Sequence, residues 1–287
     1  MPLWRPPSEA ESLIIQATLG CSFNRCSFCS MYREKDFVAR PLEEVQREIV
    51  RLGRSDHRVR RVFLADGDAM TLPTDHLLAL LESLAQAFPD LQRVASYAWP
   101  LNILKKSDAE LESLRAARLS LVYLGLESGS ARLLKKITKG ANPAMMRETI
   151  DRCRAAGIKV SATTILGLGG ERHSAEHVRE TAALVSASPP NYLSTLQIGL
   201  APIIREEFFR KFKEPFQTLD DAGMLAELEA LVASIAPRRP VIFRSNHASN
   251  ALPLGGTLPK DQERLLHEIR EVREGRGGIV PPWLRGY

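Results

Sequence analysis

The sequence predicts an α/β fold built on a parallel sheet, and three observations support this prediction. Strand-like runs alternate with helical patterns, which gives six βα units in order along the 287 residues. Hydrophobic residues make up 44% of the chain, enough to bury a full core. Neither a shift in composition nor a long linker divides the chain, so we expect one domain. Six units are fewer than the eight of a closed barrel, and both a partial barrel and an open doubly wound sheet fit the pattern.

The strands are predicted where short apolar runs stand between turn residues. They cover residues 12–20, 59–66, 92–99, 120–127, 158–167 and 192–200, with a shorter run at 240–244. Amphipathic periodicity predicts helices at residues 41–52, 74–88, 108–118, 142–157, 175 onward and 260–273. Thr74 and Ser174 are the expected N-caps of two helices, and Ser107 with Glu110 forms a capping-box pattern.

Charge and hydropathy restrict the partners that we expect. The net charge is +5, from 39 basic and 34 acidic residues, and no stripe of Lys and Arg stands out. Nucleic acid is therefore not expected as a partner. No apolar run approaches the roughly 18 residues of a membrane span, and the N-terminus has no signal-peptide pattern. The sequence predicts a cytoplasmic protein without a membrane partner, in a compartment where clustered cysteines indicate metal binding or catalysis.

The stretch CSFNRCSFCS at residues 21–30 places Cys21, Cys26 and Cys29 directly after the first predicted strand. The fourth cysteine, Cys153, falls on the apolar face of a predicted helix and is expected in the core. A zinc site needs four ligands, and no Cys or His follows at finger spacing. A redox dithiol would leave Cys21 unused. Three thiolates leave one coordination position open, where a substrate or cofactor can bind.

This loop resembles the radical S-adenosylmethionine (SAM) superfamily. In that superfamily three cysteines after the first strand hold a [4Fe–4S] cluster, and SAM chelates the fourth iron. The usual spacing is CxxxCxxC, whereas Cys21, Cys26 and Cys29 are spaced x4 and x2. Phe28 matches the aromatic residue that the family places before its last cysteine. The resemblance covers roughly residues 12 to 202.

Two polar stretches of the first half resemble SAM-binding elements of the family. DGD after the second strand is similar to the GGE-type motif that binds the amino group of SAM. By that likeness Gly67 allows close approach and Asp68 supplies an acceptor. Ser96, at the end of the third strand, falls where the subgroup of oxygen-independent coproporphyrinogen oxidase and tRNA-modifying members places another polar SAM contact.

Two further stretches resemble the same subgroup. GLESGSARLLKKITKG is similar to its fourth-strand region. That likeness implies that Glu127 contacts the ribose or methionyl part of SAM and that Lys139 holds the SAM carboxylate. TTILGLGGE is similar to a GxIxGxxxE motif beside adenine, with Ile165 in register and Thr163 where the family has glycine.

The resemblance implies a fold and a mechanism. The fold is a partial (β/α)6 TIM-type barrel over about 12–202, followed by a helical C-terminal extension over 203–287 with an irregular tail from about 274. The cluster passes one electron to SAM, and the resulting 5′-deoxyadenosyl radical abstracts hydrogen from a small or medium organic substrate. A low-potential electron donor such as flavodoxin or ferredoxin is the expected partner.

A polar stretch in the C-terminal region, FRSNHASN at residues 243–250, has two interpretations. Arg244, Asn246 and His247 are candidate catalytic residues, because arginine pairs with carboxylate or phosphate and histidine moves protons. The same residues also suit a hydrogen-bonded loop that closes the open side of the barrel. Two other functions are weighed against a small-molecule enzyme: an RNA-modifying radical SAM enzyme, and a cluster carrier without catalysis.

Overall fold

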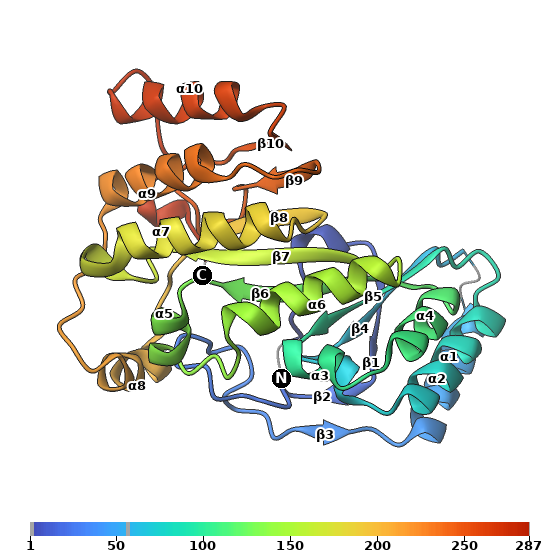
Figure 1. The fold of residues 1–287 in the computed structure, drawn as a ribbon. Coiled ribbons are helices and arrows are strands. Elements are labelled where there is room, and N and C mark those ends of the chain that lie inside the picture. Colours follow the sequence, from blue (N-terminus) through green and yellow to red (C-terminus); the bar gives the residue numbers. More distant parts are fainter. Residues whose placement is uncertain (1–2, 56–57, 287) are drawn as a thin grey trace. The chain divides into compact units, whose positions relative to one another are not determined.

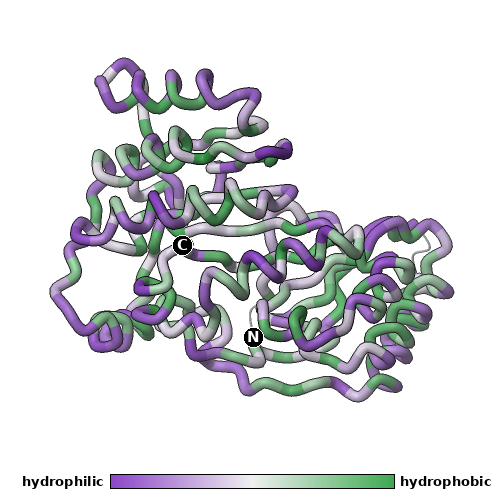
Figure 2. Tube along the Cα trace, viewed as in Figure 1, coloured by the Kyte–Doolittle hydropathy of each residue, from purple (hydrophilic) through white to green (hydrophobic). Residues whose placement is uncertain are grey.

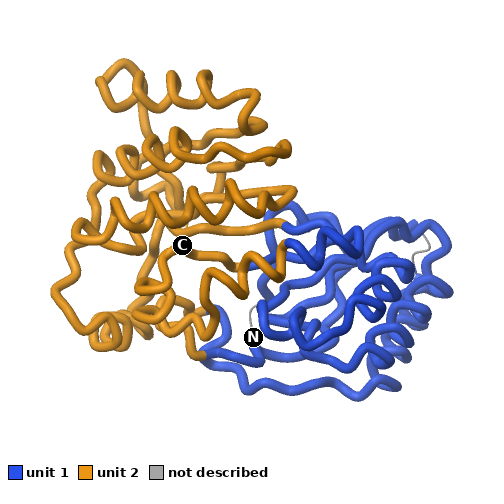
Figure 3. Tube along the Cα trace, in the orientation of Figure 1, with its two compact units in different colours: residues 1–24, 31–124, 151–160 blue, residues 25–30, 125–150, 161–287 orange. Residues whose placement is uncertain are grey.

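The computed structural model describes residues 3–55 and 58–286. The chain divides into two compact units (Figure 3). The first contains residues up to 24, 31–124 and 151–160, and the second contains 25–30, 125–150 and 161 onward. The eight principal strands follow the order β1-β4-β5-β6-β7-β8-β9-β10 (Figure 1). Strands β6 and β7 run through both units, since each begins in the first and ends in the second.

The first unit contains parallel strands covered by helices. Its strands are β1 (Leu13–Gln16), β4 (Arg61–Ala65), β5 (Arg93–Ala98) and the start of β6 (Leu119–Glu127), with a short antiparallel pair β2 (Thr18–Leu19) and β3 (Val38–Ala39). Its helices are η1 (Pro7–Glu9), α1 (Leu42–Ser55), η2 (Ala69–Thr71), α2 (Thr74–Ala87), α3 (Pro100–Leu104) and α4 (Asp108–Ala116). Val62, Leu64, Val94 and Val122 are fully buried on one face of this sheet.

The second unit carries the remaining strands and most of the later helices. Its strands are β7 (Lys159–Leu166), β8 (Tyr192–Gln197), β9 (Val241–Arg244) and β10 (Gly255–Leu258), of which only β10 is antiparallel to its neighbour. Its helices are α5 (Ala131–Lys136), α7 (Gly170–Ala187), α8 (Pro202–Phe212), α9 (Asp221–Ser234), α10 (Gln262–Arg273) and η3 (Pro282–Leu284), while α6 (Pro143–Ala155) belongs to both units. In Figure 2 these helices alternate hydrophilic and hydrophobic residues, as helices with one buried side do.

The predicted α/β class with mostly parallel strands is confirmed. All six predicted principal strands form, and the capping box of Ser107 and Glu110 is present. The sequence reading did not predict β10. The prediction of a single domain over 1–287 stays a prediction.

Two predicted N-caps are wrong. Helix α2 is capped at Pro73, so Thr74 is its first helical residue and makes no side-chain cap. Helix α7 begins at Gly170, four residues before Ser174. Gly167 and Gly170 both have positive φ, of 77° and 57°, which lets the chain turn from β7 directly into the helix. This tight turn moves the helix start upstream, and Ser174 instead bonds a carboxylate of α9.

No helix within residues 3–55 and 58–286 is long and apolar enough to cross a membrane.

Candidate functional site

The start of the cysteine loop is held against the end of β4 in the first unit. The Gly67 amide donates to the Gly20 carbonyl at 3.0 Å. A Cβ on Gly67 would lie 2.7 Å from the Cβ of Cys21, so only glycine fits there. The buried Asp66 carboxylate accepts from the Gly20 amide at 3.1 Å and from Lys35 Nζ at 2.8 Å. Gly67 thus lies close to the start of the cysteine loop, and Asp66 fixes the same turn. The approach of Gly67 to SAM stays a prediction.

Asp68 is fully buried and its carboxylate is already bonded within the first unit. It accepts from the amides of Met70 and Trp99, at 3.1 and 3.2 Å, and from Asn102 Nδ2 at 2.5 Å. Burial raises the pKa of Asp68 to about 7, although these three donors lower it. The carboxylate therefore shapes the turn into α3, and it has no exposed surface for a ligand.

Ser96 is likewise fully buried. Its hydroxyl donates to the Tyr97 carbonyl at 2.8 Å. Ser96 is in register with Leu64 and Val122, and the alternation of a strand directs Tyr97 to the opposite face. Strand ends identify the right region from the sequence, but the face on which each side chain lies depends on the register.

The other part of the cysteine loop is built in the second unit. The Cys29 amide donates to the Cys26 carbonyl at 3.2 Å, and the Ser27 amide donates to the Ile137 carbonyl at 2.9 Å. Phe28 packs against a buried apolar cluster that includes Ile165. Both cysteines remain partly exposed. The loop is therefore anchored by its backbone and by Phe28, which leaves its thiols accessible.

Glu127 and Lys139 form a buried ion pair, with Nζ 2.8 Å from Oε1. Burial works against the charged lysine, but Glu127 and the thiolates of Cys26 and Cys29 raise the pKa of Lys139 above its usual value. A Cβ on Gly125 would overlap Glu127 Oε1, so the glycine leaves room for the pair. The positive charge of Lys139 thus lies near two thiolates.

Thr163 and Ile165 lie on one face of β7. Their partners in the register are Ser194 and Leu196 of β8. Thr163 is half-buried, whereas Ile165 is 9% exposed and belongs to the apolar cluster that Phe28 covers. Within the second unit, four of the predicted residues therefore gather around the Cys26–Cys29 turn or next to it: Phe28, Glu127, Lys139 and Ile165.

A buried network behind β7 was not predicted. Glu227 of α9 accepts from the Gly167 amide at 2.6 Å and from the Ser174 hydroxyl. His177 Nδ1 lies 2.8 Å from the hydroxyl of Ser128, which follows Glu127, and His177 Nε2 is 3.9 Å from Glu227. Burial raises the pKa of Glu227 to about 7 and lowers that of His177 to about 4. The network links the loop after β6 to the turn after β7.

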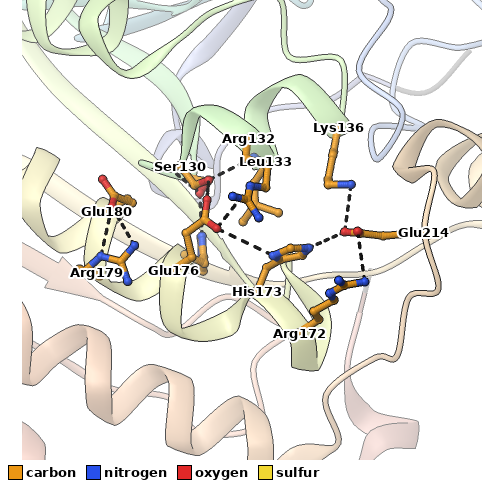
Figure 4. Close-up of polar contacts among 12 residues, drawn as sticks. Ser130, Arg132, Leu133, Lys136, Arg172, His173, Glu176, Arg179, Glu180 and Glu214 are labelled. Atoms are coloured by element: carbon orange, nitrogen blue, oxygen red, sulfur yellow. Dashed lines mark hydrogen bonds and ion pairs between the residues drawn. The ribbon is translucent and has the colours of Figure 1, made fainter.

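Figure 4 shows a second network, which fixes α5. The Glu214 carboxylate accepts from Lys136 Nζ at 2.9 Å and contacts His173 of α7. Glu176 accepts from the Ser130 hydroxyl, the N-cap of α5, at 2.6 Å. Hydrogen bonds from Lys136 and His173 lower the pKa of Glu214 to about 2. Hydrogen bonds and ion pairs thus hold α5 at both ends. The carbonyl of its C-cap, Ile137, accepts the hydrogen bond that anchors the cysteine loop.

The C-terminal polar loop is bonded to the end of β8. Asn250 donates to the Thr195 carbonyl at 2.7 Å and accepts from the Gln197 amide at 2.9 Å. His247 Nδ1 pairs with the Ser249 hydroxyl at 2.8 Å, and partial burial lowers the pKa of His247. Asn246 is exposed. Asn250 thus belongs to a hydrogen-bonded loop at the end of β8. Closure of the barrel by this loop and the catalytic roles of Arg244, Asn246 and His247 stay predictions.

The cysteine loop offers three thiols, and thiolates are the ligands that hold iron–sulfur clusters. Cys153 is fully buried and burial raises its pKa to about 12, so the core prediction for Cys153 is confirmed. In the described part of the chain, no three Cys, His, Asp or Glu side chains converge on a single metal position. Cys21, Cys26 and Cys29 are each partly exposed.

A sequence model of the Radical SAM superfamily matches residues 15–185, more than half of the chain. The chain belongs to the radical SAM superfamily. It is therefore an enzyme of a superfamily whose cofactors are a [4Fe–4S] cluster and SAM.

Among curated proteins, the tRNA-2-methylthio-N(6)-dimethylallyladenosine synthase of Alkalilimnicola ehrlichii is 28% identical over 194 residues. The match covers 63% of this chain and 42% of that protein, so this radical SAM chain spans less than half the length of the relative.

Solved structures share the fold. Coproporphyrinogen III oxidase from Escherichia coli, a radical SAM enzyme, superposes with a TM-score of 0.59 at 18% identity, over 77% of this chain and 51% of that one. The radical SAM methyltransferase TsrM from Kitasatospora setae gives a TM-score of 0.52 at 22% identity, over 65% and 34%. These neighbours confirm the radical SAM partial-barrel fold.

Proposed function

We propose that this radical SAM protein holds a [4Fe–4S] cluster at Cys21, Cys26 and Cys29, reductively cleaves SAM, and abstracts hydrogen from a small or medium organic substrate. The observation that carries the proposal is the buried Lys139–Glu127 pair beside Cys26 and Cys29. A cluster with bound SAM supplies the electron for cleavage of the sulfonium. The chain's own residues anchor the ligands, supply the counter-charge and exclude water.

The roles of the second-unit residues follow from their contacts. Lys139 offsets negative charge near Cys26 and Cys29 and is the proposed partner of the SAM carboxylate. Glu127 keeps Lys139 charged and in place at 2.8 Å. Phe28 and Ile165 form an apolar wall beside the cysteines, which keeps water away from a reactive site. Thr163 is the proposed contact on the adenine side.

In the first unit, the backbone of Gly67 is the proposed SAM contact after β4. Because Asp68 and Ser96 have no exposed side chain, we propose that both act by shaping the backbone around Gly67 and Tyr97. Loss of either should change SAM affinity through the backbone only.

Anaerobic reconstitution tests the cluster and the reaction separately. We expect close to four irons and four sulfides per chain, and release of 5′-deoxyadenosine on reduction with SAM. Lys139→Met should keep the iron content within a factor of two but weaken SAM binding about tenfold to hundredfold, as loss of a charge-assisted contact does. A chain that binds the cluster and releases no 5′-deoxyadenosine under strong reduction would be a cluster carrier, contrary to the proposal.

RNA modification is the second candidate, because the curated relative is a synthase named for a tRNA nucleoside. The chain has four cysteines, and with Cys153 buried none remains for a second cluster. A gel-shift titration with total tRNA separates the candidates. Binding below about 1 μM at physiological salt would favour RNA as the substrate over a small molecule.

The electron donor is proposed to be a flavodoxin or ferredoxin. Cluster potentials reach roughly −700 mV, so a strong biological reductant is needed. Single-turnover 5′-deoxyadenosine formation with reduced flavodoxin, compared with dithionite, tests this partner. We also propose that the protein works in the cytoplasm, where fractionation should find it.

A further inference from the structure

A row of three polar residues and one glycine crosses four strands of the second unit. In the register, Thr163 of β7 pairs with Ser194 of β8, Ser194 pairs with Arg244 of β9, and Arg244 pairs with Gly255 of β10. Paired residues point to the same side of a sheet, so these four positions form one row. The three side chains in it are half-buried. The residues that precede Ser194 and Arg244 in their strands, Leu193 and Phe243, are fully buried on the other face.

Arg244 is the unusual member of this row. Its guanidinium lies 4.9 Å from the centre of the Tyr192 ring, on the same face of β8. Within residues 3–55 and 58–286 no carboxylate forms an ion pair with it. A half-buried guanidinium without an acidic partner can form charge-assisted hydrogen bonds to the carboxylate of a ligand. Stacking on Tyr192 holds the guanidinium plane but leaves its N–H edge available.

The place beside Arg244 is open. A Cβ added to Gly255 would meet only the Phe243 carbonyl, at 3.8 Å. On the other side Ser194 offers a hydroxyl. Ile242 of β9 stands two residues before Arg244 and pairs with Tyr192, so it lies on the same face of the sheet. Its side chain is 39% exposed and offers an apolar contact. The row and its neighbour therefore combine one cation, one hydroxyl and apolar surface.

We propose that Arg244 and Ser194 bind the carboxylate of the substrate, and that the substrate is an organic acid with an apolar portion. This inference rests on the proposed function, because Thr163 is the proposed contact on the adenine side of SAM. Neighbouring strands are about 4.8 Å apart, so Thr163 and Arg244 are about 10 Å apart at the backbone. This spacing is within the length of a small organic acid. Tyr192 is a positioning residue, since it acts through the guanidinium.

Binding of three probes to the reconstituted full chain tests the proposal. The probes are phenylacetate, the neutral phenylacetamide of the same shape, and phenyl phosphate, measured by ligand-observed NMR with SAM present. We expect phenylacetate to bind about tenfold to hundredfold more tightly than phenylacetamide. Weaker binding of phenyl phosphate supports a carboxylate site, whereas tighter binding would overturn the organic-acid assignment in favour of a phosphate ester.

Three variants locate the effect. Arg244→Gln should remove the preference for phenylacetate over phenylacetamide. Gly255→Val, which keeps Arg244 and fills the open place, should weaken phenylacetate at least tenfold. Arg205→Gln is the matched control, because Arg205 also stacks on an aromatic ring, that of Phe209, but lies on α8. It should leave the preference unchanged.

Uncoupled release of 5′-deoxyadenosine separates this inference from the proposed function. If cleavage of SAM persists and Arg244→Gln keeps the full preference for phenylacetate, the carboxylate site is refuted while the radical SAM function stands. Equal binding of both probes to the unaltered protein refutes it as well. If the unaltered protein cleaves no SAM, the proposed function fails. The preference for phenylacetate over phenylacetamide then still tests whether Arg244 binds a carboxylate.

Discussion

Replacing Glu227 with glutamine should change how the stability of the protein depends on pH. Burial raises the pKa of Glu227 from 4.5 to about 7, so between these values the folded state binds a proton that the unfolded state releases. Stability contributed by this group therefore falls as pH rises. Each pKa unit corresponds to about 1.36 kcal/mol, and the resulting loss between pH 5 and pH 8 is about 2.5 kcal/mol.

Glutamine mimics the protonated carboxyl, because its amide oxygen accepts from Gly167 and its NH2 donates to Ser174. Glu227→Gln should thus lack this loss. Urea unfolding of both proteins at pH 5, 6, 7 and 8 measures the difference, which should grow by about 2.5 kcal/mol toward pH 8 in favour of the variant. Asp68 and His177 titrate in both proteins and cancel in the comparison.

Glu229, two residues along α9, provides the matched control. Hydrogen bonds from Arg270 and Arg273 lower the pKa of Glu229, so its contribution is complete above pH 4.5 and is lost only in acid. Glu229→Gln should therefore differ from the unaltered protein by a constant amount between pH 5 and pH 8. Parallel pH curves for Glu227→Gln and the unaltered protein would refute the assigned titration of Glu227.

Three further experiments, with five substitutions, give distinct expected outcomes. Cys29→Ala should abolish cluster iron measured after anaerobic reconstitution, whereas Cys153→Ala should retain it, and loss of iron in the second variant would contradict the three-cysteine site. Lys139→Ala leaves Glu127 buried without its partner and should destabilise the protein by about 3–5 kcal/mol in urea unfolding, and a loss below about 1 kcal/mol would show that the pair is not truly buried. Asn250→Ala should cost about 1–3 kcal/mol because the Thr195 carbonyl and Gln197 amide lose a partner, while the exposed Asn246→Ala should stay within about 0.5 kcal/mol. Equal effects would contradict the assigned contribution of the Asn250 hydrogen bonds.

Residue order and local pattern determined the strands and helices of this protein and the region of its candidate site. Apolar runs that alternate with amphipathic segments predicted the six strands in their correct places. They do so because the spacing of apolar residues reflects which face of each element is buried. The three clustered cysteines, with Cys153 in step with a helical apolar face, indicated a site with one open position. These features depend on residues that are close together in the chain, so they can be predicted from the sequence without the tertiary structure.

Tertiary structure decided which side chains are available. Asp68 and Ser96 stand at strand ends in the sequence, yet strand register and the start of α3 bury both. The start of α7 moved from Ser174 to Gly170 because Glu227, sixty residues away from Gly167, holds the turn after β7. The row from Thr163 to Arg244 exists only through pairing of β7, β8 and β9. Such contacts join residues far apart in the chain, and no local pattern encodes which face or partner each one finds.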